Sequence, residues 1–381
     1  MRLTTSGTPR HIAQSIIGVI TLDEVIPELK RERIRVFGEG KRPEAEFING
    51  YLAVLTVEPV SDQCEVPRVE RLRDIDHFRN GDIVVIEPES GFVRSLYRPA
   101  EMHHSLFATE RCNSNCLMCS QPPKDKDDTT LLTARNLQLI QLMKPAPPYL
   151  TITGGEPTLL GKNLFTLLRS LNEHMPETEI HMLTNGRTFA WADYVKGLAE
   201  VSHSRFSVGI PLYSDFAPDH DYIVQAKGAF DQTIAGFHQL ARYGIRSELR
   251  VVLHQLTIPR LTKLMEYIYR NLTFVEHVAL MGLEHIGYTP RNIDKLWIDP
   301  YDYQEELEEA VEYLTQRDMA VSLYNHQLCV LRPSLWRYAK KSISDWKNLY
   351  LPECGRCAVF GQCGGLFKWA VAKHSEHIHP L

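Results

Sequence analysis

Two groups of cysteines carry the clearest chemistry in this 381-residue chain. The first lies in "RCNSNCLMCS" and has the spacing Cys-x3-Cys-x2-Cys over Cys112, Cys116 and Cys119. Cysteine thiolates hold iron–sulfur clusters, and a [4Fe–4S] cluster normally takes four of them. A loop with three thiolates leaves one iron without a protein ligand. An open coordination position is what a catalytic metal centre needs.

Zinc is the alternative at this first group, with a fourth ligand from elsewhere, for example His103 or His104. Zinc sites favour paired Cys-x2-Cys or Cys/His spacing. The observed spacing therefore favours iron–sulfur chemistry.

The second group lies near the end of the chain, in "CGRCAVFGQCGG". Its spacing is Cys354-x2-Cys357-x5-Cys363, and Cys329 precedes it by 25 residues. Four thiolates complete the shell of a cubane cluster, and four thiolates equally suit tetrahedral zinc. The spacing alone does not separate the two metals here.

The composition of the chain bears on its cellular location and on the classes of partner it binds. The net charge is −5 with a sequence pI near 6.4, and no basic stripe is evident, which disfavours a nucleic-acid substrate without excluding one. No apolar run reaches membrane-spanning length, so we expect no membrane partner. The first residues lack the apolar core of a signal peptide. We therefore expect a cytoplasmic protein, in which thiols stay reduced and clustered cysteines indicate metal sites before disulfides.

Short apolar runs alternate with helical periods from about residue 104. The predicted strands are "SLFATE", "YLTITG", "EIHMLTNG", "RFSVGIPLY", "ELRVVLHQ" and "HVALMGLE". Two intervening segments repeat apolar residues at helical spacing: Leu164, Leu167, Leu168 and Leu171 in one, and Leu307, Ala310, Val311 and Leu314 in the other. This alternation predicts an α/β fold with a parallel sheet, open or curled into a partial barrel.

The predicted elements would bring two motifs to one rim of that barrel. The cysteine loop follows the first strand, and "GGEP", Gly154 to Pro157, follows the second. In such barrels the chemistry sits on the loops after the C-terminal ends of the strands.

Composition divides the chain into three predicted parts. Residues 1–100 contain β-branched runs broken by Gly, Pro and Asn, which indicate a small β-rich domain. Residues 101–320 form the predicted barrel, and residues 321–381 form a cysteine-rich extension.

With these motifs in place, the sequence resembles the radical S-adenosylmethionine (SAM) enzymes. Cys-x3-Cys-x2-Cys after the first strand and GGEP after the second are the motifs of that superfamily. The resemblance implies a (β/α)6 partial TIM-like barrel, a SAM-binding [4Fe–4S] cluster on Cys112, Cys116 and Cys119, and SAM itself. It implies reductive cleavage of SAM to a 5′-deoxyadenosyl radical, which abstracts hydrogen from a substrate.

The same resemblance assigns roles to further residues. Gly154, Gly155, Glu156 and Pro157 would bind the amino group of SAM. Met118 stands where relatives carry an aromatic residue near the adenine. Arg250 stands where many relatives bind the carboxylate of SAM, although an ordinary surface arginine is the alternative. Pro211 falls at the usual ribose-binding serine, which leaves Ser207 or a neighbour for that contact. We interpret Asn185, after the third strand, as a turn residue.

The C-terminal cysteines resemble the twitch and SPASM extensions of peptide-modifying radical SAM enzymes. This resemblance implies one auxiliary [4Fe–4S] cluster on Cys329, Cys354, Cys357 and Cys363. Segments such as "YNHQLC" and "SISDWKNLYLPEC" further resemble maturases of the His-Xaa-Ser peptide system. That resemblance implies a peptide substrate, a partner radical SAM maturase, and an electron donor such as flavodoxin or ferredoxin.

Three functions remain open at this level. The first is a radical SAM peptide maturase, the second a radical SAM enzyme acting on a small molecule or RNA, and the third a non-enzymatic iron–sulfur or zinc protein. His254, His285 and Tyr213 lie near predicted strand ends and could face a substrate. Glu284, after the sixth strand, is our candidate proton acceptor.

Overall fold

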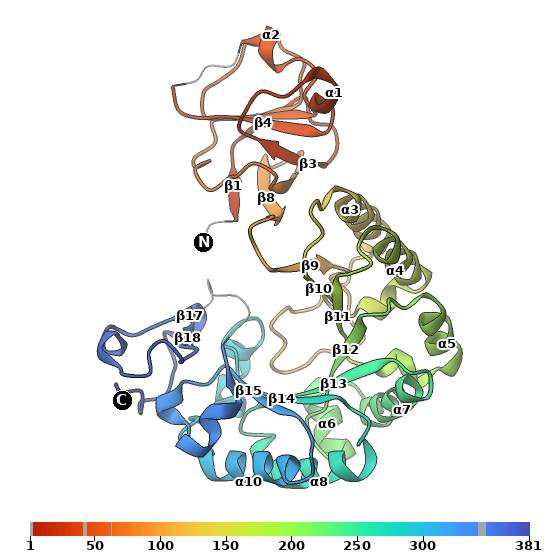
Figure 1. Cartoon of the computed structure of the whole chain (residues 1–381), viewed down its shortest axis with the longest axis vertical. Helices are drawn as coiled ribbons and strands as arrows, with labels where there is room; N and C mark the ends of the chain where they lie inside the picture. Colours follow the sequence, from red (N-terminus) through yellow and green to blue (C-terminus); the bar gives the residue numbers. More distant parts are fainter. Residues whose placement is uncertain (1–2, 41–43, 62, 342–347) are drawn as a thin grey trace. The chain divides into compact units, whose positions relative to one another are not determined.

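The structure is a computed structural model that describes residues 3–40, 44–61, 63–341 and 348–381 (Figure 1). The chain divides into two compact units. The first contains residues 1–105, 133–150 and 170–178, and the second contains residues 106–132, 151–169 and 179–381. In the described part of the chain, every helix is too short or too polar to cross a bilayer.

The N-terminal part of the first unit is built on an eight-stranded sheet in the order β1-β8-β7-β3-β4-β5-β6-β2. The strands are β1 (Thr4–Ser6), β2 (Thr8–Arg10), β3 (Ile16–Thr21), β4 (Arg33–Phe37), β5 (Ala53–Thr56), β6 (Arg68–Glu70), β7 (Ile83–Ile86) and β8 (Phe92–Tyr97), with short helices α1 (Pro27–Lys30) and α2 (Ala45–Ile48). Only Gly7 separates the two edge strands, so the sheet closes on itself. The prediction of a β-rich N-terminal region is confirmed.

Gly7 permits this closure because a Cβ there would meet the carbonyl oxygen of Glu70 at 2.2 Å. The interior of the sheet is apolar and includes Ile34, Leu55 and Ile86, which are fully buried. This packing gives the region its own hydrophobic core.

The second sheet also has eight strands, in the sequential order β16-β15-β14-β13-β12-β11-β10-β9. The strands are β9 (His103–Phe107), β10 (Tyr149–Thr153), β11 (Glu179–Leu183), β12 (Phe206–Pro211), β13 (Arg246–Leu253), β14 (His277–Gly282), β15 (Val321–Tyr324) and β16 (Ala339–Lys340). The pairs from β11 to β16 are parallel. The curled sheet is a half-barrel, which confirms the predicted fold class and extends the six predicted strands by two short ones.

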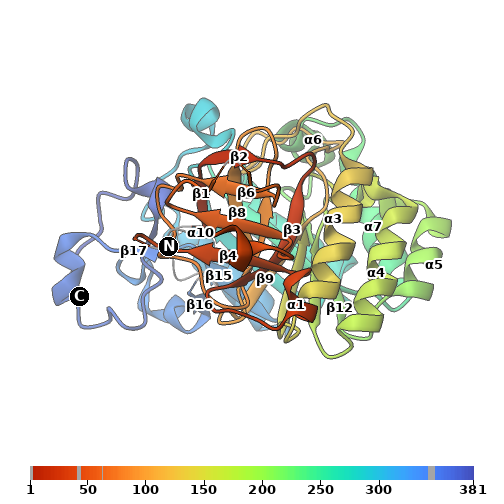
Figure 2. The ribbon, with the colours of Figure 1, turned by 90° about the horizontal axis from the view of Figure 1, so that it is seen from above.

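Helices follow the strands along the chain. They are α3 (Thr129–Leu142), α4 (Lys162–His174), α5 (Ala192–Val201), α6 (Ala217–Val224), α7 (Ala229–Arg242), α8 (Leu261–Asn271), α9 (Ile293–Leu296) and α10 (Gln304–Thr315), with 3-10 turns η1 (Pro157–Leu160), η2 (Arg187–Ala190), η3 (Ile258–Arg260) and η4 (Thr289–Asn292). Helices α5 and α7 lie side by side, as do α8 and α10 (Figures 1 and 2). The predicted apolar residues of α4 and α10 are fully buried.

Alternation along the strands decides which side chains face the inside of the half-barrel. In β13, Ser247, Leu249, Val251 and Leu253 are buried, whereas Glu248, Arg250 and Val252 are only half-buried. Successive side chains of a strand point to opposite faces. The half-buried set therefore faces the interior of the half-barrel, and the buried set packs beneath the helices.

The C-terminal extension consists mainly of 3-10 turns: η5 (Leu328–Val330), η6 (Pro333–Tyr338), η8 (Pro352–Arg356) and η9 (Lys368–Ala370). A two-stranded antiparallel sheet joins β17 (Asn348–Leu349) to β18 (Leu366–Phe367). With so little regular structure, this region depends on side-chain contacts or bound groups for its order.

Candidate functional site

The loop with Cys112, Cys116 and Cys119 follows β9, at the C-terminal end of the strand. Asp128 closes its base by accepting hydrogen bonds from the Thr109 hydroxyl at 2.5 Å and the Glu110 backbone N–H at 2.9 Å. All three thiols are half-buried. They are therefore held within the protein while part of each remains accessible.

Backbone contacts fix the middle of the loop. The N–H of Asn115 donates to Val224 and that of Leu117 donates to Ile223, at the end of α6. From the other side, the Tyr288 N–H donates to the Cys119 carbonyl at 2.9 Å. These contacts place the loop between α6 and the segment after β14, on the rim that the sequence predicts.

The three thiols crowd one another in a poorly solvated environment. Burial raises the pKa of Cys112 to about 11 and that of Cys116 to about 12, and the neighbouring cysteines add to both shifts. Burial also raises the pKa of Cys119. Three thiolates in this position need a cation to balance their charge, which the iron of a cluster would supply.

The "GGEP" segment follows β10 and lies directly against the base of the cysteine loop. The Gly155 N–H donates to Thr109 at 2.7 Å, and the Glu156 N–H donates to Arg111 at 2.8 Å. A Cβ at Gly155 would meet the Arg111 carbonyl oxygen at 2.0 Å, and Gly154 has φ of +140°. Only glycines allow this approach.

Glu156 is fully buried, and the protein itself surrounds its carboxylate with donors. One oxygen accepts from the Thr158 N–H, the Thr158 hydroxyl and the Thr184 hydroxyl, and the other accepts from the Asn185 N–H at 2.7 Å. Burial raises the pKa of Glu156, and these hydrogen bonds oppose the rise. Glu156 thereby ties the end of β10 to the end of β11. Pro157, also buried, begins η1.

Asn185 and Arg187 contact the cysteine loop. The Asn185 amide nitrogen lies 3.9 Å from the Cys112 sulfur and 2.5 Å from the Asn113 side-chain oxygen. The Arg187 guanidinium donates to the Asn113 carbonyl and, at 3.1 Å, to the Ser114 hydroxyl. From the sequence, we interpret Asn185 as a turn residue alone, and we do not identify Arg187 as a residue that contacts the cysteine loop. The "TNGR" run after the third strand was the available signal.

Arg250 lies on the inner face of the sheet in a polar network. It donates to Glu248 at 2.8 Å and lies 3.2 Å from the Met281 sulfur. Glu248 is also 2.9 Å from the His277 Nδ1, and Ser207 is 2.9 Å from the His181 Nδ1. Burial lowers the pKa of His181 to about 4. The interior of the half-barrel is therefore polar, and Arg250 is already paired within it.

An apolar cluster lies beneath the cysteine loop and contains Met118 and Tyr213, together with Leu117, Ile223, Val224, Ala229 and Leu296. The charges of Cys116 and Cys119 add to the rise that burial gives the pKa of Tyr213. His254, at the end of β13, is completely buried, and its ring lies 6.3 Å from that of Tyr213. Met118 and Tyr213 are thus close to the cysteines. Glu284 is half-buried, two residues beyond β14.

All four C-terminal cysteines, Cys329, Cys354, Cys357 and Cys363, line one cavity of about 390 Å³. The remaining lining is mostly apolar and includes Leu328, Leu351 and Phe360. The backbone N–H groups of Gly365 and Leu381 each lie 3.5 Å from a cysteine sulfur, Cys363 and Cys357 respectively. Cysteines from segments 25 residues apart converge on one hollow, which fits the shell of a four-thiolate cluster.

Across the described ranges, no three His, Cys, Asp or Glu side chains converge closely enough to hold one metal ion. A [4Fe–4S] cluster distributes its thiolates over several irons. The three-cysteine loop beside a glycine backbone fits such a cluster together with a small ligand at its free iron.

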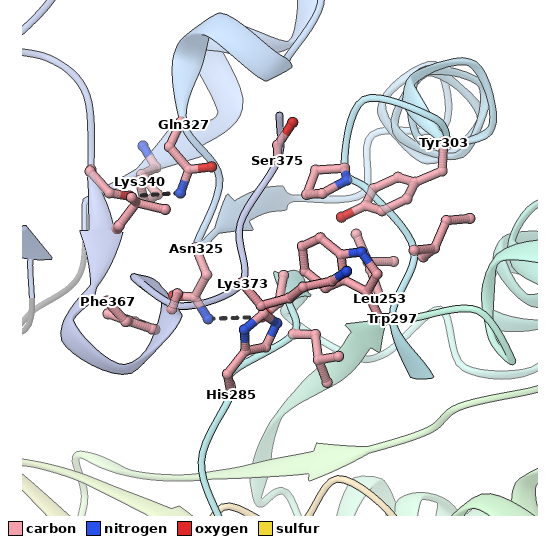
Figure 3. Close-up of a pocket in the computed structure, with 18 residues that line it drawn as sticks. Leu253, His285, Trp297, Tyr303, Asn325, Gln327, Lys340, Phe367, Lys373 and Ser375 are labelled. Atoms are coloured by element: carbon pink, nitrogen blue, oxygen red, sulfur yellow. Dashed lines mark hydrogen bonds between the residues drawn. The ribbon is translucent and has the colours of Figure 1, made fainter. Parts of the chain in front are cut away.

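A pocket of about 640 Å³ lies next to the cavity of the C-terminal cysteines (Figure 3). Leu253, Gly282 and Asn325 contribute to it from the ends of β13, β14 and β15. The rest comes from the segments after these strands and from the C-terminal extension. This pocket therefore opens on the same rim as the cysteine loop.

Comparison with known proteins identifies relatives for part of the chain. Residues 106–268 match the model of the radical SAM superfamily. GTP 3′,8-cyclase of Bradyrhizobium diazoefficiens is 26% identical over 190 residues, 47% of this chain and 52% of that protein. Fe-coproporphyrin III synthase of Methanosarcina barkeri is 32% identical over 211 residues, 55% of this chain and 49% of that protein. The chain thus spans about half the length of the curated relatives it matches.

Among solved structures, that of Streptococcus suis SuiB bound to S-adenosylmethionine has a TM-score of 0.49 at 16% identity. The match covers 66% of this chain and 56% of that chain.

Proposed function

We propose, on the premise that residues 106–268 form a radical SAM domain, that this protein is a peptide maturase with two iron–sulfur clusters. The first cluster is held by Cys112, Cys116 and Cys119. The second is held by the four C-terminal cysteines. The substrate is a ribosomally made peptide of the His-Xaa-Ser type, modified through abstraction of one hydrogen.

The observation that carries the proposal is the convergence of the C-terminal cysteines next to a pocket on the barrel rim. The cavity with Cys329, Cys354, Cys357 and Cys363 shares Gln327, Gly365 and Leu366 with the larger pocket. A substrate in that pocket would lie beside the second cluster. A cluster that served only to fold the extension would need no such neighbour.

The residues around the first site have separate tasks. The cluster would pass one electron from an external donor to SAM, and SAM, on release of methionine, would supply the hydrogen-abstracting 5′-deoxyadenosyl radical. The glycine backbone at Gly154 and Gly155 packs directly against the base of the cysteine loop, and Glu156 fixes that backbone against β11. Arg187 and Asn185 hold the loop in place, and Met118 offers an apolar surface for the adenine.

A small-molecule substrate is the second candidate. The matched relatives include a GTP 3′,8-cyclase, named for a small-molecule substrate, and an Fe-coproporphyrin III synthase, named for a small-molecule product. Each match covers only about half of either protein, whereas the cysteine-lined cavity lies outside residues 106–268. The resemblance of the C-terminal cysteines to the twitch and SPASM extensions of peptide-modifying enzymes supports the peptide.

Mass spectrometry of a peptide co-expressed with the enzyme tests the proposal. A short peptide with His-Xaa-Ser repeats, encoded next to this protein, is produced anaerobically with either wild-type protein or Cys116→Ala. We expect a mass change with the wild type alone, because the variant cannot assemble the first cluster.

An unchanged peptide, together with turnover of GTP or coproporphyrin by the reconstituted protein, would favour the second candidate. A reconstituted protein that holds no iron or sulfide and never cleaves SAM would contradict both.

A further inference from the structure

The residues that line the pocket on the barrel rim include basic but no acidic side chains. Lys340 and Lys373 are among its 18 lining residues, and none of the 18 is an Asp or Glu (Figure 3). Both lysines are exposed, and neither has an acidic partner in the described part of the chain. The protein thus offers two ammonium groups to whatever enters.

The polar groups that shape the pocket are already engaged. The Asn325 amide donates to the Gly282 carbonyl at 3.1 Å, and the Gln327 amide donates to the Gly365 carbonyl at 2.8 Å (Figure 3). Asn325 has a φ of +63°, a left-handed conformation that asparagine tolerates better than most residues. These contacts build the wall and leave the lysines available for a ligand.

Unlike Asn325 and Gln327, the buried His285 is not engaged in a side-chain hydrogen bond in the part of the chain that the structure describes. It is 9% exposed, and neither of its ring nitrogens makes a hydrogen bond within the described residues. The ring meets Trp297 edge-on at 4.9 Å, and the Lys373 ammonium lies 5.3 Å from the Trp297 ring centre. Burial and the nearby Lys373 charge lower the pKa of His285, and the Lys373 backbone, which is close to the ring but outside hydrogen-bond geometry, partly offsets this. A neutral His285 keeps one N–H to donate.

We propose that this pocket binds a carboxylate of the peptide substrate, which the N–H of His285 contacts and which the ammonium groups of Lys340 and Lys373, both in the pocket lining, attract. The inference rests on the proposed function and adds a chemical requirement to it. The substrate carries an acidic residue that anchors it beside the C-terminal cysteines. Ammonium groups and a neutral imidazole are suitable donors for a carboxylate.

The surroundings suit an extended ligand better than a compact one. A second hollow, of about 960 Å³, shares His285, Trp297 and Lys373 with the pocket, and its lining also includes the carboxylate of Asp294. The cysteine-lined cavity adjoins the pocket on its other side. A chain anchored by its carboxylate can continue along the second hollow past Ile293 and Pro290, which line it.

Binding of matched peptide pools tests the proposal. Three pools of decapeptides carry a neutral fluorophore, an amidated C-terminus, and Glu, Gln or Lys at one central position in otherwise random uncharged sequence. Fluorescence anisotropy with the reconstituted protein and SAM, under anaerobic conditions, gives the dissociation constants. We expect the Glu pool to bind about tenfold more tightly than the Gln pool, as two partly exposed ion pairs allow. The Lys pool should bind most weakly.

Variants assign the preference to the pocket. Lys340→Gln combined with Lys373→Gln should remove the preference for Glu, whereas Lys368→Gln should keep it. Lys368 is equally exposed in the same extension but does not line the pocket. SAM cleavage without substrate should be unchanged in all of them, which shows that the variants are folded.

Equal binding of the Glu and Gln pools to the wild type overturns the carboxylate pocket and leaves the peptide substrate standing. A preference for Glu that survives in the double variant overturns the role of the two lysines. Failure to bind any pool, with SAM cleavage intact, contradicts the peptide substrate itself and with it the pocket.

Discussion

At the scale of single residues, the cysteine loop depends on side chains that carry no metal-binding chemistry. Arg187 donates to the Asn113 carbonyl and the Ser114 hydroxyl within the loop, and its Nε donates to Gln232 at 2.7 Å. Hydrogen bonds from a charged donor stabilise more than neutral ones. Arg187 therefore contributes to holding Cys112 and Cys116 at a fixed separation.

Replacement of Arg187 with Met tests this contribution. We expect roughly thirtyfold slower SAM cleavage and incomplete cluster loading, since losing such hydrogen bonds costs on the order of 2 kcal/mol. Iron per chain and 5′-deoxyadenosine formation are the measurements. Arg246→Met is the matched control, because Arg246 pairs with Glu276 at the opposite end of the sheet. Full loading and activity in Arg187→Met would show that the loop holds its shape without the guanidinium.

The sequence predicts the cysteines but not Arg187, and the reason is physical. The spacing of Cys112, Cys116 and Cys119 is local, so it is visible in eight consecutive residues. Arg187 reaches Asn113 across 74 positions of sequence. Only the order of β9, β10 and β11 as neighbours in the sheet brings the two loops together.

At the scale of elements, the end of β10 must pass close to the loop after β9. The Gly155 backbone lies against Arg111 so closely that any side chain would collide with a backbone atom. A backbone carbonyl cannot rotate away as a flexible side chain can. One of the two loops would have to move.

Gly155→Ala should therefore destabilise the protein by roughly 2 kcal/mol, as overpacking of a tight contact does, and should abolish SAM cleavage. Gly361→Ala is the control, because a Cβ there meets nothing within 4 Å. Thermal unfolding and 5′-deoxyadenosine formation report the two effects. Wild-type activity in Gly155→Ala would mean that the contact is not needed for cleavage.

His254 makes the end of β13 sensitive to acid. Burial lowers its pKa to about 3 in the folded protein, against about 6.5 in an unfolded chain. Above pH ~6.5 the ring is neutral in both states. As the pH falls toward 3, the unfolded state takes up a proton that the folded state does not, so the free energy of unfolding falls.

The free energy of unfolding in urea, measured from pH 7.5 to pH 5 for wild type and His254→Asn, tests this linkage. The loss attributable to His254 is about 2 kcal/mol at pH 5. The stability advantage of wild type over the variant should shrink by about that amount. A constant difference across the pH range would contradict a neutral buried His254.

The fold was predictable to the extent that its elements are long enough to show a pattern. Strands β9 to β14 have five to eight residues, and the sequence predicts all of them. Strand β15 has four residues and β16 has two, too few for alternation to be visible. Pairing with β14 and with each other defines them. The closure of the N-terminal sheet at Gly7 likewise depends on contacts remote in sequence.

At the scale of the whole molecule, one segment connects the two cysteine groups. Tyr288, after β14, donates its backbone N–H to Cys119, and His285 in the same segment lines the carboxylate pocket. That pocket in turn shares residues with the cavity of the C-terminal cysteines. The residues that line this pocket are spread along the chain from Leu253 to Ser375, so no local sequence motif predicts the pocket.

This arrangement separates the cleavage of SAM from the conversion of the substrate. The first requires Cys112, Cys116 and Cys119, and the second requires the pocket and its neighbouring cavity as well. Cys357 lines that cavity and is not among the residues that line the pocket on the barrel rim.

Cys357→Ala should therefore lower the iron content from about eight to about four atoms per chain, since each cubane cluster holds four. SAM cleavage without substrate should stay within about twofold of wild type, because the first cluster keeps its ligands. Peptide product should be absent by mass spectrometry. Cys64→Ala, which removes a thiol outside both groups, should retain both iron and product. Full product formation by Cys357→Ala would show that the second cluster takes no part in the reaction on the peptide, and the C-terminal cysteines would then serve to order the extension alone.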